Sequence, residues 1–292
     1  MNMAGKYMIL CVAGQSNAVG FDESPVDKDY MEKFRTRRLW QLGLWGEDNL
    51  QIVPLQACAQ NFQDMRPYGN PESTPGQPGT KGMQLPLGDL LLDRIPEDYD
   101  ILVLPCAYGG VGFTVGETGI YDPRTRRPSE GRLRWGVQSP YYLALKDRLR
   151  FALDQNPENQ FLGVVWLQGE FDFEDGNGNI RGFTEMTQDF FATFSQEYPG
   201  RVYRGDWNRD IWYNVETTAY WYTQGDCPMI WAHYKTWNPK TYVEIPRDTD
   251  TNAVNGTGVT TAIRPAHFGN DAFYRVIAPA VAAKMESRFH KK

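Results

Sequence analysis

The chain has 292 residues, of which 41% are hydrophobic and 23% are charged, which is the composition of a globular protein with a large core. Its formal net charge of −6 argues against a nucleic-acid-binding protein, because such proteins usually carry a basic face. No linker, repeat or long run of like charge marks a boundary in the sequence. We therefore expect a single domain over residues 1–292, with long loop insertions at about 60–82 and 207–258.

Short apolar runs alternate along the chain with segments of helical periodicity. Continuous apolar runs predict strands at 7–13, 51–55, 101–107, 161–167 and 229–232. Apolar residues spaced three and four apart predict helices at 87–94, 141–155, 183–197 and 271–289. This alternation is typical of an α/β fold with a central, mostly parallel sheet covered by helices on both faces. In such sheets, functional sites form beyond the carboxyl ends of the strands.

The first predicted strand leads directly into a serine. Ser16 stands among small residues in the stretch Val-Ala-Gly-Gln-Ser-Asn-Ala at 12–18. A serine hydroxyl becomes a good nucleophile only where the backbone exposes it and a base removes its proton. Ser16 is therefore the candidate nucleophile, and the rest of the chain must supply the base.

Histidine is the candidate base, and the chain has three histidines. His290 lies in the C-terminal tail and is expected to be solvated. His267 lies in a predicted loop between a proline and a glycine, just before the last predicted helix, and such a loop is well placed to face a site. His233 follows a strand-like run and is the competing candidate. We favour His267.

Acyl transfer also needs hydrogen-bond donors around the negative oxygen that develops in the transition state. The candidates are the backbone N–H of Ser16, the backbone N–H of Gly109 or Gly110, and the side-chain amide of Gln168. Glycine permits a close approach of backbone to ligand, although a Gly-Gly pair is also compatible with a plain turn. Gln168 closes a buried strand, so its amide must have a partner or a purpose.

Several other types of site find no support in the sequence. The four cysteines form no CxxC pair, so we expect buried free thiols rather than disulfides or a zinc site: Cys11, Cys58, Cys106 and Cys227. No metal-binding or nucleotide-binding motif is present, and we expect neither a metal nor a cofactor. The aromatic stretch at 207–237 predicts core packing, or alternatively a wall against which sugars stack.

The N-terminal residues imitate a signal peptide, but the apolar segment is short and runs into the serine motif, so we expect no cleavage. No apolar run is long enough to span a membrane. The free thiols fit a reducing compartment, and the periplasm stays open. We expect no nucleic-acid partner and no membrane insertion.

Taken together, these motifs resemble the SGNH-type carbohydrate esterases, and within them the bacterial sialate O-acetylesterases. The resemblance covers most of the chain from Tyr7 to His267. It is carried by Gly14-Gln15-Ser16-Asn17, Gln63-Asp64-Met65, Pro105-Cys106 with Gly109-Gly110, Arg134-Trp135-Gly136, Asn156-Pro157 with Phe161-Leu162-Gly163, Trp166-Leu167-Gln168-Gly169-Glu170, and Thr260-Thr261-Ala262 with Arg264 and His267-Phe268.

The resemblance implies a three-layer α/β/α sandwich of flavodoxin-like type and metal-free hydrolysis of acetyl esters through an acetyl-serine intermediate. Ser16 would be the nucleophile and His267 the general base, with the oxyanion donors named above. The wider superfamily places an aspartate three residues before the histidine, where this chain has Arg264. Either a backbone carbonyl or an acid from elsewhere would then orient His267, with Glu170 and Asp172 as candidates.

The implied substrate, O-acetylated sialic acid, carries a carboxylate, which a planar guanidinium binds well. Arg134 is the first choice for this contact, followed by Arg66 and Arg264, and Gln15 is a further candidate for substrate binding. A structural role for Arg134 is an equal alternative. Two other functions stay open: a deacetylase of bacterial surface polysaccharide of the phage tail type, and a catalytically silent carbohydrate-binding module. The resemblance implies a small-molecule or glycan substrate as the partner, and a location in the bacterial cytoplasm or periplasm, or in a phage particle or prophage product.

Overall fold

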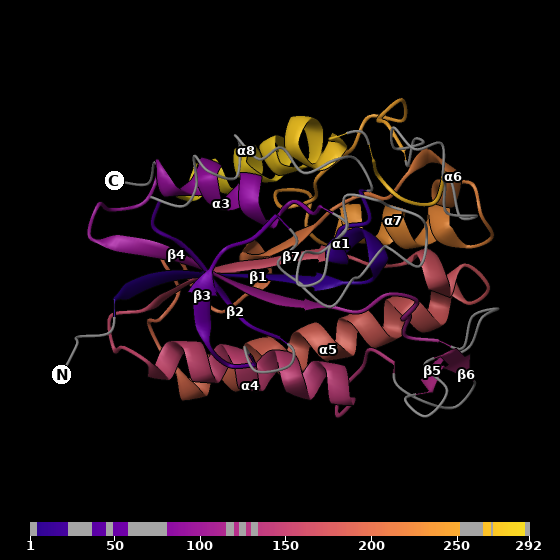
Figure 1. The fold of residues 1–292 in the computed structure, drawn as a ribbon. Helices are drawn as coiled ribbons and strands as arrows, with labels where there is room; N and C mark the ends of the chain where they lie inside the picture. Colours follow the sequence, from indigo (N-terminus) through magenta and orange to yellow (C-terminus); the bar gives the residue numbers. More distant parts are fainter. Residues whose placement is uncertain are drawn as a thin grey trace.

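The computed structural model describes residues 5–22, 37–44, 49–57, 81–114, 120–122, 127–129, 134–251, 265–269 and 271–289. Its centre is a six-stranded sheet (Figure 1). In spatial order the strands are β3 (Ile52–Pro54), β2 (Leu39–Leu42), β4 (Tyr99–Ala107), β1 (Lys6–Gly14), β7 (Gln160–Leu167) and β8 (Trp212–Asn214). All neighbouring pairs are parallel except β2 and β3, which are antiparallel.

Successive residues of the central strands enter two different cores. Along β1, Met8, Leu10 and Val12 join one buried cluster, and the residues between them join the other. Both sets are almost fully buried, as expected for a parallel sheet with helices on each face. Burial on both faces explains why these strands are continuous apolar runs in the sequence.

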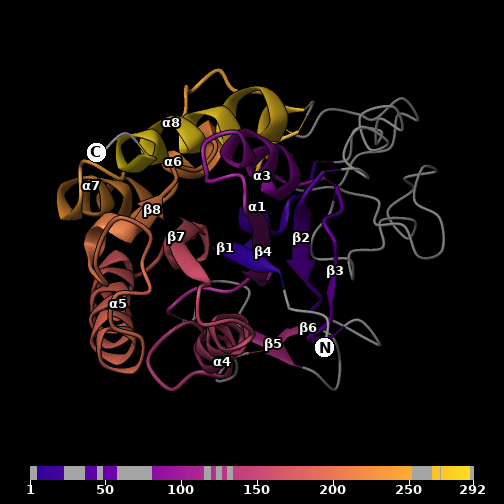
Figure 2. The ribbon, with the colours of Figure 1, turned by 90° about the vertical axis from the view of Figure 1, so that its left-hand side faces the viewer.

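Helices cover both faces, which confirms the predicted α/β/α fold class. Helices α3 (Gln84–Leu92) and α8 (Ala278–Phe289) lie on one side of the sheet, and α4 (Pro140–Asp154) and α5 (Gly176–Glu197) lie on the other (Figures 1 and 2). A π-helical turn at Phe273–Ile277 precedes α8. Helix α7 (Cys227–Trp237) packs beside α5, and the short α6 (Ala219–Tyr222) lies next to α7. The two-stranded pair β5 (Ile120–Asp122) and β6 (Arg127–Ser129) stands apart from the main sheet.

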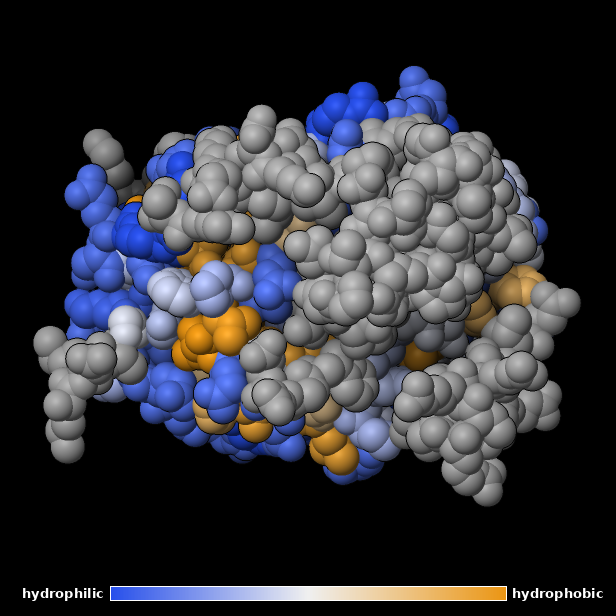
Figure 3. All heavy atoms as spheres, in the orientation of Figure 1, coloured by the Kyte–Doolittle hydropathy of each residue, from blue (hydrophilic) through white to orange (hydrophobic). Residues whose placement is uncertain are grey.

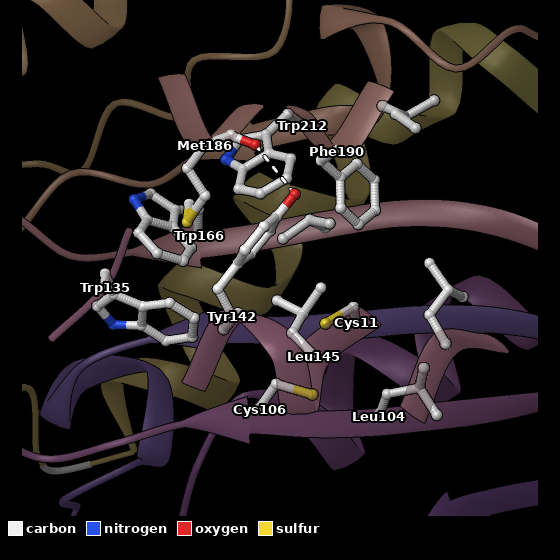
Figure 4. Packing of buried hydrophobic residues seen from close by; sticks show 14 of the residues in the cluster. Cys11, Leu104, Cys106, Trp135, Tyr142, Leu145, Trp166, Met186, Phe190 and Trp212 are labelled. Carbon is white, nitrogen blue, oxygen red and sulfur yellow. Dashed lines mark hydrogen bonds between the residues drawn. The ribbon is translucent and has the colours of Figure 1, made fainter. Parts of the chain in front are cut away.

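The start of α4 follows directly from its sequence. Pro140 occupies the first turn, where its missing N–H costs nothing, and Ser139 Oγ accepts a hydrogen bond from the backbone N–H of Tyr142 at 3.2 Å. Tyr142 then reaches through the core, where its hydroxyl donates to the backbone oxygen of Met186 on α5 (Figure 4). Figure 4 also shows the tryptophan rings of this core, which belong to Trp135, Trp166 and Trp212.

The sequence predictions agree with four of the observed strands, namely β1, β3, β4 and β7. Strands β2, β5, β6 and β8 were not predicted, and the expected strand at 229–232 is wrong because these residues belong to α7. Pro228 lies in the first turn of α7, and the buried positions Cys227, Ile230, Trp231 and Tyr234 recur at helical spacing. The apolar run at 229–232 contains two buried residues of this stripe and two exposed neighbours, so it resembles a short strand in the sequence.

The region expected as an insertion at 207–258 supplies the edge strand β8 and the helices α6 and α7, whereas most of the expected insertion at 60–82 lies outside the described residues. Cys11, Cys106 and Cys227 are free and buried, as predicted, and Cys58 falls outside the described ranges.

Among the helices described, none combines the length and apolarity needed to cross a bilayer. On the face shown in Figure 3, hydrophilic residues predominate among the described residues, and apolar areas lie between them.

Candidate active site

The turn that presents Ser16 depends on a glycine at the end of β1. Gly14 has a φ of 129°, and a Cβ there would lie 2.0 Å from the backbone oxygen of Leu167 on β7. The same oxygen accepts a hydrogen bond from the backbone N–H of Gln15 at 2.8 Å. The chain then enters the single helical turn α1 (Ser16–Val19). Ser16 therefore lies at the carboxyl edge of the sheet, with 5% of its surface exposed.

His267 is placed in the loop before the last helix, and its ring is buried. The ring stacks on Phe21 with centroids 4.5 Å apart and an interplanar angle of 22°. Its Nδ1 is buried and has no hydrogen-bond partner in the described part of the chain. Burial lowers the pKa of His267 to about 4, because the imidazolium cation is poorly solvated there. The ring is therefore neutral at physiological pH and able to accept a proton.

Asn17, the residue after Ser16, joins the serine turn to the histidine loop. Its Nδ2 donates to the backbone oxygen of Ala266 at 3.2 Å, and its Oδ1 accepts from the backbone N–H of Phe268 at 3.2 Å. These two bonds lie on either side of His267. Asn17 belongs to the motif at 14–17, but no role was predicted for it from the sequence. The structure thus brings the Ser16 turn and the His267 loop together at one edge of the sheet.

The candidate oxyanion donors lie at the same edge. Gly109 and Gly110 follow β4, the neighbour of β1, and the two loops are linked by a 3.1 Å hydrogen bond from the backbone N–H of Tyr108 to the oxygen of Gly14. Among the described residues, no acceptor is found for the backbone N–H of Ser16, Gly109 or Gly110. Gly110 adopts a φ of 71°, which favours glycine. Their role as oxyanion donors stays a prediction.

Gln168 closes β7, as predicted, and its amide belongs to a buried polar network. Nε2 donates to Asp172 Oδ2 at 2.6 Å, and Oε1 accepts from Asn179 Nδ2 at 3.0 Å and from the Tyr234 hydroxyl at 3.3 Å. One N–H of the amide remains for a further acceptor. A part in the oxyanion hole is therefore still open to Gln168, but its orientation is set by this network.

Among the described residues, neither of the two acids considered for orienting His267 forms a hydrogen bond or an ion pair with it, and His267 Nδ1 has no partner there. Glu170 Oε1 instead accepts from Asn17 Nδ2 at 3.0 Å and from Thr217 Oγ1 at 2.8 Å, and its Oε2 is buried without a partner in the described part of the chain. Burial raises the pKa of Glu170. Glu170 is thus linked to the histidine loop through Asn17.

The four candidate substrate residues have different outcomes. Arg66 and Arg264 lie outside the described residues. Gln15 is fully buried, its Oε1 accepts from the backbone N–H of Phe171 at 3.3 Å, and its Nε2 has no partner in the described structure. Arg134 is half-buried, and no described residue forms a hydrogen bond or an ion pair with its guanidinium.

Trp135 anchors the segment that carries Arg134 to the serine turn. Its indole N–H donates to the oxygen of Gly14 at 3.2 Å, and its backbone N–H donates to the oxygen of Gly112 at 3.0 Å. Arg134 is therefore attached next to both the nucleophile turn and the Gly-Gly loop.

The competing histidine, His233, lies on α7, where its ring packs edge-on against that of Phe183. No group of three or more His, Cys, Asp or Glu side chains suited to a metal occurs within the described ranges.

Comparisons with known proteins bear on the family and the fold of the chain. No family model matches the chain. The chain is 35% identical over 230 residues to the probable 9-O-acetyl-N-acetylneuraminic acid deacetylase of Escherichia coli K12, a match that spans 74% of this chain and 68% of that protein. The crystal structure of NanS matches with a TM-score of 0.76 and 28% identity over 98% of both chains. A protein of Arabidopsis thaliana, 16% identical, matches in fold with a TM-score of 0.58 over 98% of this chain and 100% of its own.

The predicted resemblance to SGNH-type carbohydrate esterases is thereby confirmed at the level of sequence and fold. The chain belongs to the family of the Escherichia coli deacetylase and, like its members, is a carboxylic ester hydrolase.

Proposed function

We propose that the protein removes O-acetyl groups from sialic acid through an acetyl intermediate on Ser16, with His267 as the general base. The single observation that carries this proposal is the junction at Asn17. It holds together a serine turn and a buried neutral histidine from opposite ends of the chain, beside backbone N–H groups for which the described residues offer no acceptor. The deacetylase name of the Escherichia coli relative supports the choice of substrate.

In the first step, His267 accepts the proton of the Ser16 hydroxyl as Ser16 Oγ attacks the acetyl carbonyl carbon. The carbonyl oxygen becomes negative and is stabilised by the N–H groups of Ser16 and of Gly109 or Gly110, each worth about 3 kcal/mol. The bond to the sugar oxygen then breaks, and that oxygen takes the proton from His267. Acetyl-Ser16 and the deacetylated sugar are the products of this half-reaction.

In the second step, a water molecule replaces the sugar. His267 accepts a proton from the water, whose oxygen attacks the acetyl carbon. The bond between that carbon and Ser16 Oγ breaks, and Ser16 recovers its proton from His267 as acetic acid leaves and loses its own proton to solvent. A neutral base is required at the start of each step, and the low pKa of buried His267 keeps it neutral.

The test is acetate release from a mixture of O-acetylated sialic acids by the wild type, by Ser16→Ala and by the control Ser195→Ala, which removes an exposed hydroxyl on α5. We expect Ser16→Ala to lose about a thousandfold or more and Ser195→Ala to lose nothing. Hydrolysis of an activated aryl acetate without hydrolysis of O-acetylated sialic acid would support the serine esterase mechanism but refute sialic acid as the substrate. Release from an acetylated polysaccharide alone would favour the phage-type deacetylase. Sugar binding that survives Ser16→Ala, with no turnover by the wild type, would establish a binding module instead.

A further inference from the structure

Asn17 is fully buried, and all of its hydrogen-bonding groups serve the region around His267. One N–H of its amide donates to Ala266 O at 3.2 Å and the other to Glu170 Oε1 at 3.0 Å, while Oδ1 accepts from the Phe268 N–H at 3.2 Å. The amide thus satisfies both of its hydrogens inside the protein. No part of it is left to bind substrate through a donor, so a role in holding other groups is the one its contacts support.

The two backbone bonds of Asn17 fix the histidine from both sides. Ala266 and Phe268 are its neighbours in sequence, so bonding the oxygen of one and the N–H of the other determines where the backbone of His267 lies. The ring itself has no orienting partner at Nδ1 among the described residues and rests on Phe21. Because Asn17 directly follows Ser16 in α1, the same residue sets the position of the base relative to the nucleophile.

The surroundings of Asn17 permit one orientation of its amide. Nitrogen and oxygen in an amide are assigned from their partners, and here three partners agree. Glu170 Oε1 and the oxygen of Ala266 accept hydrogen bonds, and the N–H of Phe268 donates one. Glu170 is itself held by Thr217 Oγ1 at 2.8 Å. A flipped amide would place its oxygen against the acceptors Glu170 Oε1 and Ala266 O, and its nitrogen against the N–H of Phe268. Glu170, which is held by Thr217, therefore locks the orientation in which Asn17 fixes the loop.

We infer that Asn17 is the positioning residue of the catalytic base, locked by Glu170, and that it fixes the placement of His267 at Ser16 without any acid of the described residues bonded to the imidazole. This inference rests on the proposed function, since it assigns the base that the proposed mechanism uses. A displacement of about 1 Å in such a geometry costs roughly a hundredfold in rate. Binding of the substrate does not involve Asn17, so the loss is expected in kcat and not in KM.

Asn159 provides a matched control. It is also fully buried, its Oδ1 accepts from the backbone N–H of Tyr7 at 2.8 Å, and its Nδ2 donates to the backbone oxygen of Ala152 at 2.8 Å. It therefore holds two backbone groups as Asn17 does, but at the start of β1 and β7, the opposite end of these strands from Ser16. Replacing either asparagine by alanine removes comparable hydrogen bonds from the interior.

We would measure kcat and KM for an aryl acetate in Asn17→Ala and Asn159→Ala, at a temperature at which both are folded by circular dichroism. We expect Asn17→Ala to lower kcat about a hundredfold with KM within about threefold, and Asn159→Ala to leave both within about threefold. Equal losses of kcat in the two variants, or no loss in Asn17→Ala, would overturn the inference. A wild type that hydrolyses no acetate at all would refute the proposed function instead.

Amide hydrogen exchange gives a readout that does not depend on activity. The Phe268 N–H should lose its protection in Asn17→Ala and keep it in Asn159→Ala, because its acceptor is Asn17 Oδ1. Unchanged protection in Asn17→Ala would show that the loop is held by other contacts and would contradict the inference.

A pair of charge variants tests the lock at Glu170. Asn17→Asp keeps an acceptor for Phe268 but sets a carboxylate against Glu170 and Ala266 O, and we expect kcat to fall at least a hundredfold. Adding Glu170→Gln lets the new amide at 170 donate to the new carboxylate at 17. The double variant should recover about tenfold in kcat, because the link between the two side chains is restored while the bond to Ala266 is not. No recovery would exclude Glu170 as the lock.

Discussion

Asp172 and Gln168 are joined by a 2.6 Å hydrogen bond between two fully buried side chains of the turn that follows β7, at the carboxyl edge of the sheet. Asp172 also accepts from the backbone N–H groups of Phe113 and Thr114 at 3.1 Å and 2.8 Å, and from Thr114 Oγ1 at 2.7 Å. It therefore ties the loop after β4 to the turn after β7. Asp172, which was considered as a partner for His267, is instead the centre of a hydrogen-bond network that holds these loops together.

Replacing Asp172 with asparagine should destabilise the protein strongly. The new amide nitrogen would face the amide groups of Gln168 and Asn179, which donate to Asp172 Oδ2 at 2.6 Å and 2.7 Å. A buried donor without an acceptor, together with the lost charge-assisted bonds, costs about 3 kcal/mol in the free energy of unfolding. Urea unfolding measures this change. The control Asp93→Asn, at an exposed ion pair with Arg37, should change it by less than about 1 kcal/mol. A loss no larger than that of the control would show that the network is dispensable.

Gly14 and Gly200 form a second comparison, because both have positive φ but differ in the space around them. Gly200 has a φ of 72° and no atom within 4 Å of a Cβ, so Gly200→Ala should cost about 1 kcal/mol from backbone strain alone. Gly14→Ala adds a 2.0 Å contact with the backbone oxygen of Leu167. We expect it to cost at least about 3 kcal/mol more in urea unfolding, since two central strands must separate. Equal costs would mean that the strands move apart easily.

The strands that build this edge were predictable because they are buried on both faces. Strands β1, β4 and β7 are continuous apolar runs, and a serine, a Gly-Gly pair and a glutamine follow their carboxyl ends. The short β2 and β8 carry too few residues for a periodic signal, and both include polar side chains that are fully buried, Gln41 and Asn214. Pattern alone does not identify such strands, because their burial is decided by their neighbours in space.

The residues of the site were predictable to the extent that strand ends gather at one edge. What the sequence did not reveal was the direction of each polar side chain. Asn17 reaches residues about 250 positions away, and Asp172 turns to the loop after β4 and not to His267. Such contacts depend on the final packing of loops, and a single sequence contains no periodic signal for them.

The pH dependence of activity should reflect the burial of His267. The neutral imidazole is the active form, so kcat/KM should stay constant through pH 6.5 and fall only as the pH drops through about 4. Stability has the same sign: between pH 6.5 and about 4 the unfolded chain binds a proton that the folded chain does not. The free energy of unfolding should therefore decrease on acidification across this window, by up to about 3 kcal/mol.

An NMR titration of the imidazole signals checks the pKa of His267 directly. Burial also lowers the pKa of His233, so the titration is best made in His233→Gln, which leaves two histidines. We expect the signal of His267 to titrate with a midpoint near 4. A midpoint near 6.5 for His267 would show that its ring is hydrated in solution.

Arg134 should determine the preference for an acidic sugar. Arg134 is half-buried and directly precedes Trp135, which bonds the serine turn, and its guanidinium has no hydrogen-bond or ion-pair partner among the described residues. A bidentate bond to a substrate carboxylate is worth about 2 kcal/mol, so Arg134→Ala should raise KM for O-acetylated sialic acid at least about tenfold. KM for a neutral aryl acetate should be unchanged, because that substrate has no carboxylate. For Arg134→Lys, KM for O-acetylated sialic acid should lie between the values of the wild type and of Arg134→Ala, since lysine keeps the charge but not the planar fork.

The control Arg150→Ala, at a surface pair with Glu197 on the outside of α4, should leave KM for both substrates unchanged. Equal changes for the acidic and the neutral substrate would assign Arg134 to the support of its loop and leave the carboxylate to another cation.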